Sequence, residues 1–347
     1  MNLDAAFEFR EGFAMKAMVL THTGPIATRP LELKEVRTPQ PQAGEIRVKV
    51  TACGVCHTDL DEAEGRLAAR LPAIPGHQIV GHVDALGPEA AKFKPGDRVG
   101  IAWIFSVDGT CEFCRAGNEN LCVGFRGTGC DADGGYAEYI VAPEASVYPI
   151  PKAFTDAQAA PLLCAGVIGY RALRLTNLKD GQTLGLFGFG ASAHIAIQVA
   201  QKWDCRVFVF TRSEEHRALA RKLGADWVGG AKDDPPAKVD GAVIFAPVGA
   251  LYLDALRVLD RGGTAASAGI HMSPIPELDY DRLLYHERTI RSVANATRRD
   301  GEELLGIAAQ IPVRTTTQSF PLENANEALA LLKAGRVNGA AVLRVRS

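Results

Sequence analysis

The sequence predicts an α/β protein of two domains, in which an N-terminal β domain precedes a doubly wound parallel sheet. The chain has 347 residues, and domains average roughly 150 residues. Period-two strand patterns dominate before residue 150, and strand and helix patterns alternate after residue 155. The length and the change of pattern together indicate two units of different architecture.

The composition is that of an ordinary globular protein. Apolar residues make up 47% and charged residues 22%, which argues against disorder. The formal charge of −2 gives no electrostatic reason to expect nucleic acid or an anionic membrane as a partner. The sequence shows neither an apolar run of roughly 18 residues nor the basic start of a secretory signal. We therefore expect a cytoplasmic protein whose eight cysteines are thiols or metal ligands.

The N-terminal domain is expected to begin near Met15, with residues 1–14 as a loose extension. Segments 46–50, 97–101 and 136–141 have strand patterns, and glycine and proline mark the turns between them. An all-β domain of short strands fits this pattern.

A capping box at Thr155 and Gln158 predicts a helix start, and the apolar stretch that follows has helical length. Strand and helix patterns then alternate over 183–187, 191–203, 206–210, 213–223, 239–245, 251–259 and 263–269. This alternation predicts right-handed βαβ units on a parallel sheet. A last helix (325–334) and strand (340–345) can return to the first domain.

A glycine-rich turn joins the first of these strands to the next helix. Gly188, Gly190 and Ala193 hold the G-x-G-x-x-A positions, and Ala191 opens the helix. The first glycine makes the turn, the second lets the backbone approach phosphates, and the small alanine lets the helix pack on the sheet. This context favours a dinucleotide pyrophosphate over the alternative, a tight turn without a ligand.

The end of the second strand indicates which dinucleotide binds. Thr211, Arg212 and Ser213 follow that strand, and no acid occurs before Glu214. An acid would bind a ribose 2′-hydroxyl and repel a 2′-phosphate, whereas hydroxyl and guanidinium groups suit the phosphate. The pattern predicts NADP(H) in preference to NAD(H); otherwise Arg212 is a solvated residue at a helix start.

Four potential metal ligands lie in one loop: Asp108, Cys111, Cys114 and Cys122. Three thiolates and a carboxylate suit a closed, tetrahedral structural zinc. The alternative is a set of free buried thiols.

A second, dispersed group contains Cys56, His77 and Cys164. Two thiolates and one imidazole would bind zinc and leave a fourth position open, as in a catalytic site. From spacing alone, a redox pair of Cys56 with Cys53 and a core role for Cys164 are equally good interpretations.

At these residues the sequence resembles the zinc-dependent alcohol dehydrogenases of the medium-chain dehydrogenase/reductase superfamily, over nearly the whole chain from Met15. The resemblance implies a GroES-like β-barrel catalytic domain over 1–164, completed by 302–347, and a Rossmann coenzyme domain over 165–301. The motifs that carry it are Cys56-His57-Thr58-Asp59, Gly76-His77, the cysteine-rich loop, Leu163-Cys164-Ala165-Gly166 and the nucleotide turn.

The resemblance also assigns roles to residues. It implies that Cys56, His77 and Cys164 bind a catalytic zinc, that Thr58 hydrogen-bonds the alcohol, and that Asp59 orients the histidine ligand. The implied cofactors are this zinc, a structural zinc and the nicotinamide cofactor.

Further positions follow from the same resemblance. His57 and Arg298 match residues that contact the cofactor pyrophosphate, and Trp103 matches an aromatic wall of the substrate pocket. The implied substrates are small alcohols and aldehydes, and dimeric or tetrameric relatives imply a homo-oligomer.

Three positions depart from the family pattern. Gln78 replaces a glutamate behind the zinc, Asp61 replaces a histidine that ends the proton relay, and Asp108 replaces the first cysteine of the structural loop. None of these changes removes a catalytic zinc ligand, so we expect activity to be retained.

The implied reaction is reversible hydride transfer between a primary alcohol or aldehyde and NADP(H), with Thr58 passing the alcohol proton towards Asp61 and solvent. Two alternatives are a zinc-free NADPH-dependent quinone or enoyl reductase and a non-catalytic cofactor-binding protein. The remaining histidines are expected to be structural: His82, His194, His216, His271 and His286.

Overall fold

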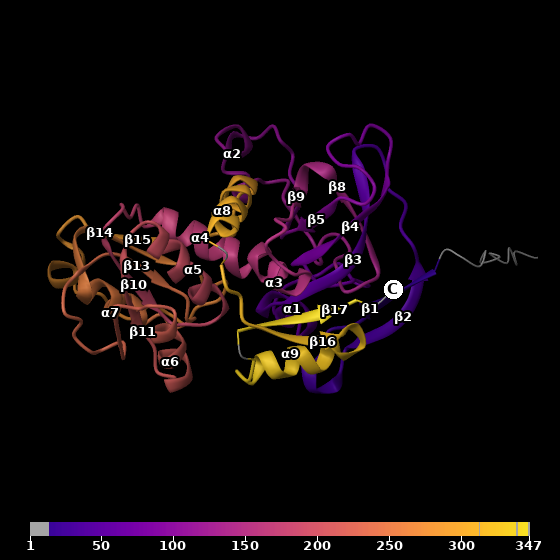
Figure 1. Cartoon of the computed structure of the whole chain (residues 1–347). Helices are drawn as coiled ribbons and strands as arrows, with labels where there is room; N and C mark the ends of the chain where they lie inside the picture. Colours follow the sequence, from indigo (N-terminus) through magenta and orange to yellow (C-terminus); the bar gives the residue numbers. More distant parts are fainter. Residues whose placement is uncertain (1–13, 312, 338, 346–347) are drawn as a thin grey trace, which may run out of the picture.

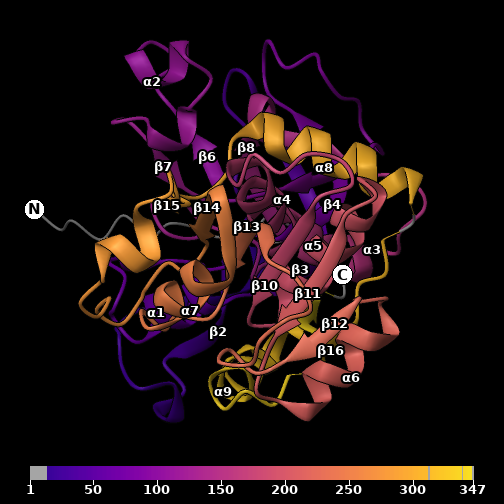
Figure 2. The ribbon, with the colours of Figure 1, turned by 90° about the vertical axis from the view of Figure 1, so that its left-hand side faces the viewer.

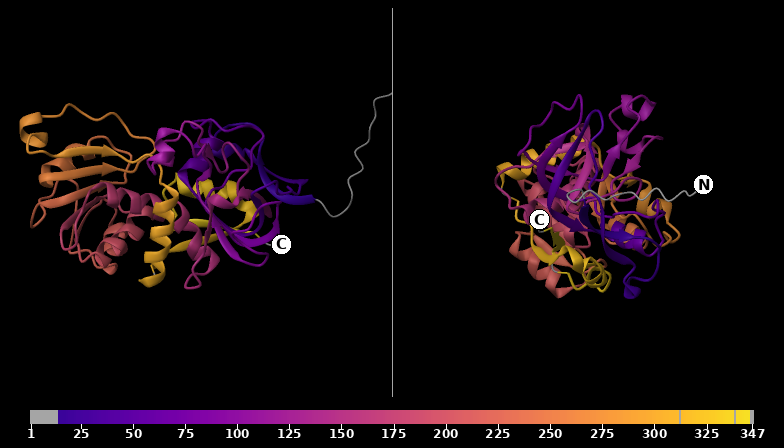
Figure 3. Two further views of the ribbon diagram at one scale, coloured as in Figure 1. Left: turned by 90° about the horizontal axis from the view of Figure 1, so that it is seen from above. Right: turned by 90° about the vertical axis from the view of Figure 1, so that its right-hand side faces the viewer.

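The computed structural model describes residues 14–311, 313–337 and 339–345. Two sheets form two lobes that lie side by side in Figure 1 and in the view from above in Figure 3. We call them the mixed-sheet lobe, built on seven strands, and the parallel-sheet lobe, built on six. The predicted α/β class is confirmed. The extension expected over 1–14 lies outside the described residues except for Ala14, which begins the first strand.

The mixed-sheet lobe takes its elements from both ends of the chain. Its strands are short and its helices are few, as the glycine- and proline-rich sequence predicts. The elements are β1 (Ala14–Leu20), β2 (Leu31–Arg37), β3 (Glu45–Val55), α1 (His57–Ala63), β4 (Ile79–Leu86), β5 (Arg98–Ile101), β6 (Ile104–Ser106), α2 (Glu112–Arg115), β7 (Arg126–Gly127), β8 (Tyr139–Pro143), β9 (Val147–Pro149), α3 (Asp156–Ala159), β16 (Thr317–Pro321), α9 (Ala325–Lys333) and β17 (Ala340–Arg344).

The C-terminal strand lies inside the main sheet of this lobe. The strand order is β16-β17-β3-β4-β5-β9, and β8 also pairs with β3. β17 runs antiparallel to β3, with Leu343 opposite Cys53, and in Figure 1 the yellow strands lie beside the indigo ones. β3 therefore has partners along its length up to Val55. Because Cys56 follows Val55 directly, the pairing of β3 fixes the position of Cys56.

The parallel-sheet lobe contains the predicted alternation of strands and helices. All pairings of its sheet are parallel. The elements are α4 (Ala165–Leu175), β10 (Thr183–Phe187), α5 (Ala191–Lys202), β11 (Arg206–Phe210), α6 (Glu214–Lys222), β12 (Trp227–Gly229), β13 (Val239–Ile244), α7 (Leu251–Val258), β14 (Leu259–Ser267), β15 (Thr289–Ser292) and α8 (Arg298–Gln310).

The order of these strands is β12-β11-β10-β13-β14-β15. The chain reverses direction across the sheet between β10 and β13, and in such sheets ligands bind beyond the carboxyl ends of the strands at the reversal. β10 is wholly buried, and the Phe187 and Phe210 rings stack with centroids 4.2 Å apart. Figure 2 shows these strands close together between α5 and α7.

The prediction of one continuous helix after Thr155 is wrong, because the helix is interrupted. The predicted capping box forms, but α3 ends at Ala159 and a 3-10 helix, Ala160–Leu163, follows. Pro161 cannot donate a backbone hydrogen bond and its ring crowds the preceding turn, so the α-helix cannot continue. Cys164 sits at the break before α4 begins, with non-helical backbone angles.

The predicted domain limits at 164/165 and 301/302 remain predictions, and α8 runs across the second of them. Within the described part of the chain, none of the helices combines the length and apolarity needed to cross a membrane.

One buried carboxylate joins α4 to the start of α8. The Asp300 side chain is fully buried and accepts hydrogen bonds from Thr297, from Arg171 at 2.8 Å and from Arg174 at 2.6 Å. Burial alone would raise the pKa of Asp300, but the hydrogen bonds from Thr297 and the Arg171 guanidinium outweigh it and lower that pKa. The carboxylate is therefore charged in the folded protein.

Asp300→Asn is expected to reduce the free energy of unfolding by about 3 kcal/mol, because the α4 arginines lose a buried carboxylate. The pKa of Asp300 is lower in the folded state, so its contribution is fully present above the unfolded-state pKa of about 4. It is lost as the pH falls through the lower folded-state pKa. Urea unfolding at several pH values measures both effects.

The matched control is Arg299→Ala, which removes an exposed ion pair with Glu303 in the same helix. It should change the unfolding free energy by less than about 0.5 kcal/mol. Equal losses in the two variants would contradict the role of Asp300.

Candidate functional site

The first side chains of the site come from the junction of β3 and α1. Cys56 is the N-cap of α1, and its backbone N–H donates to Asp59 Oδ2 at 2.7 Å. Tyr136 donates its hydroxyl to the same oxygen at 3.0 Å. The other oxygen of Asp59 lies 3.2 Å from His77 Nδ1. Since Nδ1 faces the carboxylate, Nε2 is the ring nitrogen left to bind a metal.

The structure brings the three dispersed residues together. One ligand atom each from Cys56, His77 and Cys164 lies within 4.8 Å of the other two. The two sulfur atoms are 3.8 Å apart, and sulfurs bound to one tetrahedral zinc at about 2.3 Å would be about 3.8 Å apart. The donor set therefore fits a zinc ion, and three protein ligands leave a fourth position open.

The three side chains perturb one another's pKa values, as closely packed titratable groups do. Hydrogen bonding with Cys164, supported by His77, lowers the pKa of the Cys56 thiol despite its burial. The same bond, together with burial, raises the pKa of Cys164. Burial opposes the charged form of His77, but the charge and hydrogen bonding of Asp59 and Cys56 together outweigh it and raise the pKa of His77. Closely packed sulfur and imidazole donors are those that zinc prefers.

Thr58 and Trp103 flank these residues. Thr58 is 4% exposed, and its Oγ1 lies 3.7 Å from Cys56 Sγ. The Trp103 indole meets the His77 ring edge-on, with centroids 4.9 Å apart, and stacks on Phe125 at 6.3 Å. Gly127 makes room for the indole, because a Cβ there would lie 2.9 Å from it.

Two buried polar side chains lie behind the site. The Gln78 side chain packs against Gly54, where a Cβ would lie 2.7 Å from Gln78 Oε1. Glu62, in α1, is fully buried, and neither of its oxygens has a hydrogen-bond partner among the described residues. Burial, together with the negative charge of Asp59, raises the pKa of Glu62 to about 9, so it is a neutral acid at neutral pH.

The cysteine-rich loop forms a second compact donor set. One ligand atom each from Asp108, Cys111, Cys114 and Cys122 lies within 4.8 Å of the others. This loop, which carries α2, projects from the body of the protein in Figures 1 and 2. Four donors at these separations suit a closed tetrahedral ion.

Backbone N–H groups hold these donors in place. Asp108 Oδ1 accepts from Cys111 and Thr110, and these bonds lower the pKa of Asp108. Cys122 Sγ accepts from Asp108 at 3.4 Å and from Gly124 at 3.3 Å. The aspartate is therefore presented as a carboxylate, the form that binds a cation.

The glycine-rich turn has the form that a phosphate needs. Gly188 has a φ of +91°, and a Cβ there would lie 3.0 Å from the Ala246 nitrogen. Gly190 is the N-cap of α5 and has open space where a Cβ would stand. Ala193 is fully buried against the sheet. The first N–H groups of α5, which begins at Ala191, therefore face an approachable surface.

The residues after β11 have different surroundings. Thr211 is buried, Arg212 is exposed, and Ser213 Oγ caps α6 by accepting from the His216 N–H. Glu214 forms ion pairs with two arginines of α6. The acid closest to Arg212 in the sequence is thereby neutralised.

Three further predicted residues lie on α1 and at the start of α8. His57 is exposed at the start of α1. The Arg298 N–H donates to Glu119 at 2.9 Å, so Arg298 lies against the cysteine-rich loop. Asp61 forms an ion pair with Arg66. Its other oxygen, Oδ2, lies 3.2 Å from Nε2 of His271 in the other lobe.

Sequence reasoning missed several of these residues. Tyr136 was visible only as part of a strand pattern, and Glu62 and Glu119 only as ordinary acids. Their roles depend on contacts between distant segments, so no local signal could have identified them.

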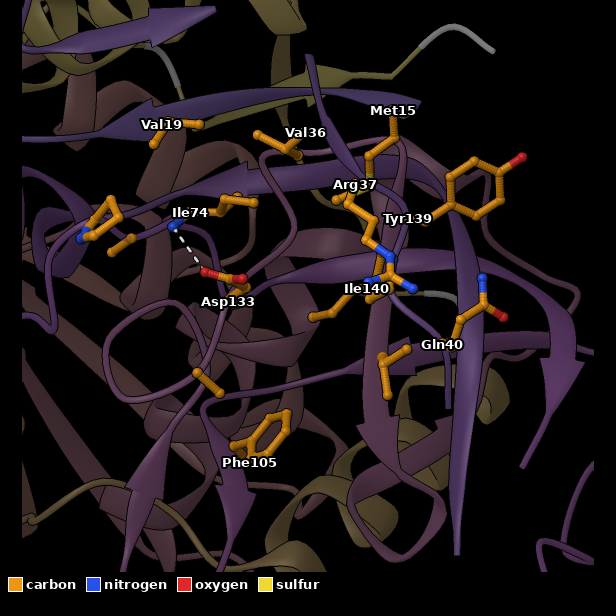
Figure 4. Close-up of a pocket in the computed structure, with 15 residues that line it drawn as sticks. Met15, Val19, Val36, Arg37, Gln40, Ile74, Phe105, Asp133, Tyr139 and Ile140 are labelled. Carbon is orange, nitrogen blue, oxygen red and sulfur yellow. Dashed lines mark hydrogen bonds between the residues drawn. The ribbon is translucent and has the colours of Figure 1, made fainter. Parts of the chain in front are cut away.

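A cavity of about 370 Å³ lies elsewhere in the mixed-sheet lobe. Figure 4 shows Met15, Val36 and Phe105 among its lining side chains, with the Asp133 carboxylate bonded to the Ile74 N–H. Its lining includes none of the metal donors described above. We therefore assign it no part in the candidate site.

Two family profiles match the sequence. The profile described as "Alcohol dehydrogenase GroES-like domain" matches residues 42–152, and the profile described as "Zinc-binding dehydrogenase" matches residues 193–310. Together they span more than half of the chain. The predicted GroES-like and Rossmann architecture is confirmed by these matches and by the parallel sheet.

Full-length relatives agree with the profiles. A probable alcohol dehydrogenase, AdhA, of Mycobacterium tuberculosis is 49% identical over 337 residues, covering 95% of this chain and 97% of that protein. An alcohol dehydrogenase of Geobacillus stearothermophilus is 38% identical over 327 residues, covering 91% and 97%. A solved structure described as an NAD-dependent alcohol dehydrogenase superposes with a TM-score of 0.88 at 28% identity, covering 96% of this chain and 100% of that one.

The two donor sets predict the metal content of the protein. The wild type, expressed with zinc, is expected to contain two zinc ions per chain, one for each set. Cys164→Ala and Cys122→Ala should each contain one, because each loses a ligand of a different set. Elemental analysis measures this, with Cys205→Ala, a buried thiol outside both sets, as the control. Two ions retained in Cys164→Ala would contradict the first site.

Proposed function

The chain belongs to the zinc-type alcohol dehydrogenase family of the medium-chain dehydrogenase/reductase superfamily, and from this we propose that it catalyses reversible hydride transfer between a primary alcohol or its aldehyde and NADP(H). Its relatives support alcohol dehydrogenase activity as such. The observation that carries the more specific proposal is the convergence of Cys56, His77 and Cys164 beside Thr58.

Cys56, Cys164 and His77 Nε2 would hold the catalytic zinc. When bound, zinc supplies a Lewis acid that favours the alkoxide in one direction and polarises the aldehyde carbonyl in the other. Asp59 positions two of these ligands at once, the His77 ring and the Cys56 backbone. Because Asp59 is fully buried, water does not compete for these contacts.

The remaining residues of the pocket bind and orient the alcohol. Thr58 accepts the hydroxyl proton of the substrate and passes it on, since a hydroxyl both donates and accepts. Trp103 limits the pocket on the side of His77, so the pocket favours small and medium alcohols.

Cofactor binding is assigned to the crevice beyond the carboxyl ends of β10 and β11. The turn from Gly188 to Ala193 would hold the pyrophosphate, with His57 and Arg298 approaching it. Thr211, Arg212 and Ser213 would bind the 2′-phosphate of NADP(H), supported by the exposure of Arg212 and the pairing of Glu214 with other arginines.

Two other functions are weaker. A zinc-free quinone or enoyl reductase would not require two thiols and an imidazole at the separations that zinc binding needs. A non-catalytic cofactor-binding protein has no use for a buried hydroxyl beside that donor set. Assembly as a dimer or tetramer and a cytoplasmic location remain part of the proposal.

The cofactor proposal predicts a clear preference in steady-state kinetics. The wild type should reduce small aldehydes with a higher kcat/KM for NADPH than for NADH. Arg212→Ala should lower kcat/KM for NADPH by about 10- to 100-fold, because it removes a charge-assisted hydrogen bond to the 2′-phosphate. The kcat/KM for NADH should change little, because NADH lacks that phosphate.

Arg221→Ala, in the same helical region but paired with Glu214, is the matched control and should keep the NADPH preference. A wild type that prefers NADH would overturn the assignment of the 2′-phosphate site.

The proton-transfer proposal predicts that Thr58→Val lowers kcat for alcohol oxidation by about 100-fold or more, because the isosteric side chain cannot carry a proton. Thr58→Ser retains the hydroxyl and should stay within a few-fold of the wild type. Stopped-flow measurement of NADPH formation compares the two variants. Equal rates would exclude the hydroxyl from the reaction.

A further inference from the structure

A contact between a carboxylate and an imidazole crosses from one lobe to the other beside the site. Asp61 belongs to α1 of the mixed-sheet lobe, and His271 follows β14 in the parallel-sheet lobe. His271 Nε2 lies 3.2 Å from Asp61 Oδ2. The two residues are separated by 210 positions in the sequence, so only the packing of the two lobes brings them together.

Asp61 is held so that one oxygen remains for the histidine. Arg66 contacts only Oδ1 of Asp61, through Nε at 2.7 Å and through Nη2 at 2.6 Å. Arg66 also pairs with Glu64, which in turn pairs with Lys333 at 2.7 Å. The Asp61 side chain is only 9% exposed, whereas that of His271 is 55% exposed. The pair therefore has one end in the interior and one end in water.

The position of Asp61 connects this pair to the substrate hydroxyl. Thr58 and Asp61 are three residues apart on α1, so they share a face of the helix, with a rise of about 4.5 Å between them. Both are buried, at 4% and 7% exposure. His271 lies beyond the carboxyl end of β14, at the edge of the sheet where the nucleotide is expected to bind.

We propose that His271 accepts the proton released from the alcohol and passes it to bulk water, and that Asp61 positions its imidazole for this transfer. The inference rests on the proposed function. In alcohol oxidation the O–H bond and one C–H bond on the carbinol carbon break, and the electron pair of the O–H bond forms the C=O double bond of the aldehyde. The C–H hydrogen leaves with its electron pair as hydride to the nicotinamide of NADP+. The remaining proton moves through the Thr58 hydroxyl and water to His271 Nδ1. The imidazolium then returns that proton to solvent, and the histidine is regenerated.

The chemistry of the pair suits this role. Imidazole is the side chain that ordinarily changes charge between about pH 5 and 8. A carboxylate at Nε2 holds the proton on that nitrogen and leaves the lone pair of Nδ1 free as the base. The surrounding charges on Asp61, Glu64, Arg66 and Lys333 balance one another.

The test compares His271→Gln and Asp61→Asn with His286→Gln, which removes an imidazole of the same lobe whose ring lies tilted against that of Tyr285. Single-turnover alcohol oxidation with NADP+ is measured from about pH 5 to 8. His271→Gln should lower the neutral-pH rate by about 10- to 100-fold and abolish the rise of rate with pH. Added imidazole should restore part of that rate. His286→Gln should match the wild type.

A second measurement does not depend on turnover. Nitrogen NMR of the zinc-loaded protein without nucleotide should show His271 as the Nε2–H tautomer, identified by its absence from His271→Gln. Asp61→Asn should lose that tautomer preference, because a neutral amide no longer fixes the proton.

The outcomes are distinct. If His271→Gln keeps the pH profile of the wild type, or raises only KM for NADP+, the pair merely joins the lobes and the proposal is overturned. A wild type that oxidises no alcohol overturns the proposed function itself, whatever the variants show.

Discussion

The candidate site depends on one buried carboxylate. Asp59 contacts the His77 ring, the Cys56 backbone and the Tyr136 hydroxyl, which come from three separate segments of the chain. Removing a buried charge that has several partners is strongly destabilising, because every partner is left buried without its hydrogen bond or opposite charge. Asp59 thus makes the positions of two metal donors interdependent, and the third, Cys164, is presented by a helix break that Pro161 causes.

Much of this organisation could be predicted from the sequence. The strands at 183–187 and 206–210 have the predicted bounds because buried parallel strands are short apolar runs between clear turn signals. The capping box at Thr155 formed as predicted, since it depends on residues only three apart. The donor set of the cysteine-rich loop could be identified because its spacing is informative. Cys56, His77 and Cys164 could be grouped only through the family resemblance, because spacing alone left other interpretations equally good.

Other features could not be predicted, for physical reasons. The interruption of the helix after Thr155 is an exception, because Pro161 stands in the sequence and could have predicted it despite the apolar pattern. β4 alternates less clearly than β3, and its pairing is shifted by bulges. Tyr136 and His271 contact segments far from them in the chain, and a single sequence contains no record of those distances. Thus the ligands could be named in advance, but the groups that position them could not.

The place of β17 within the mixed sheet affects how the polypeptide is made. The strands of the parallel sheet, between 183 and 292, are synthesised before β17. The parallel-sheet lobe can therefore fold while the rest of the polypeptide is still being synthesised. During this interval β3 presents an unpaired edge, which is a hazard for aggregation. A nascent chain arrested before residue 340 would expose that edge and lack a finished metal-binding lobe, which makes it a natural client for chaperones.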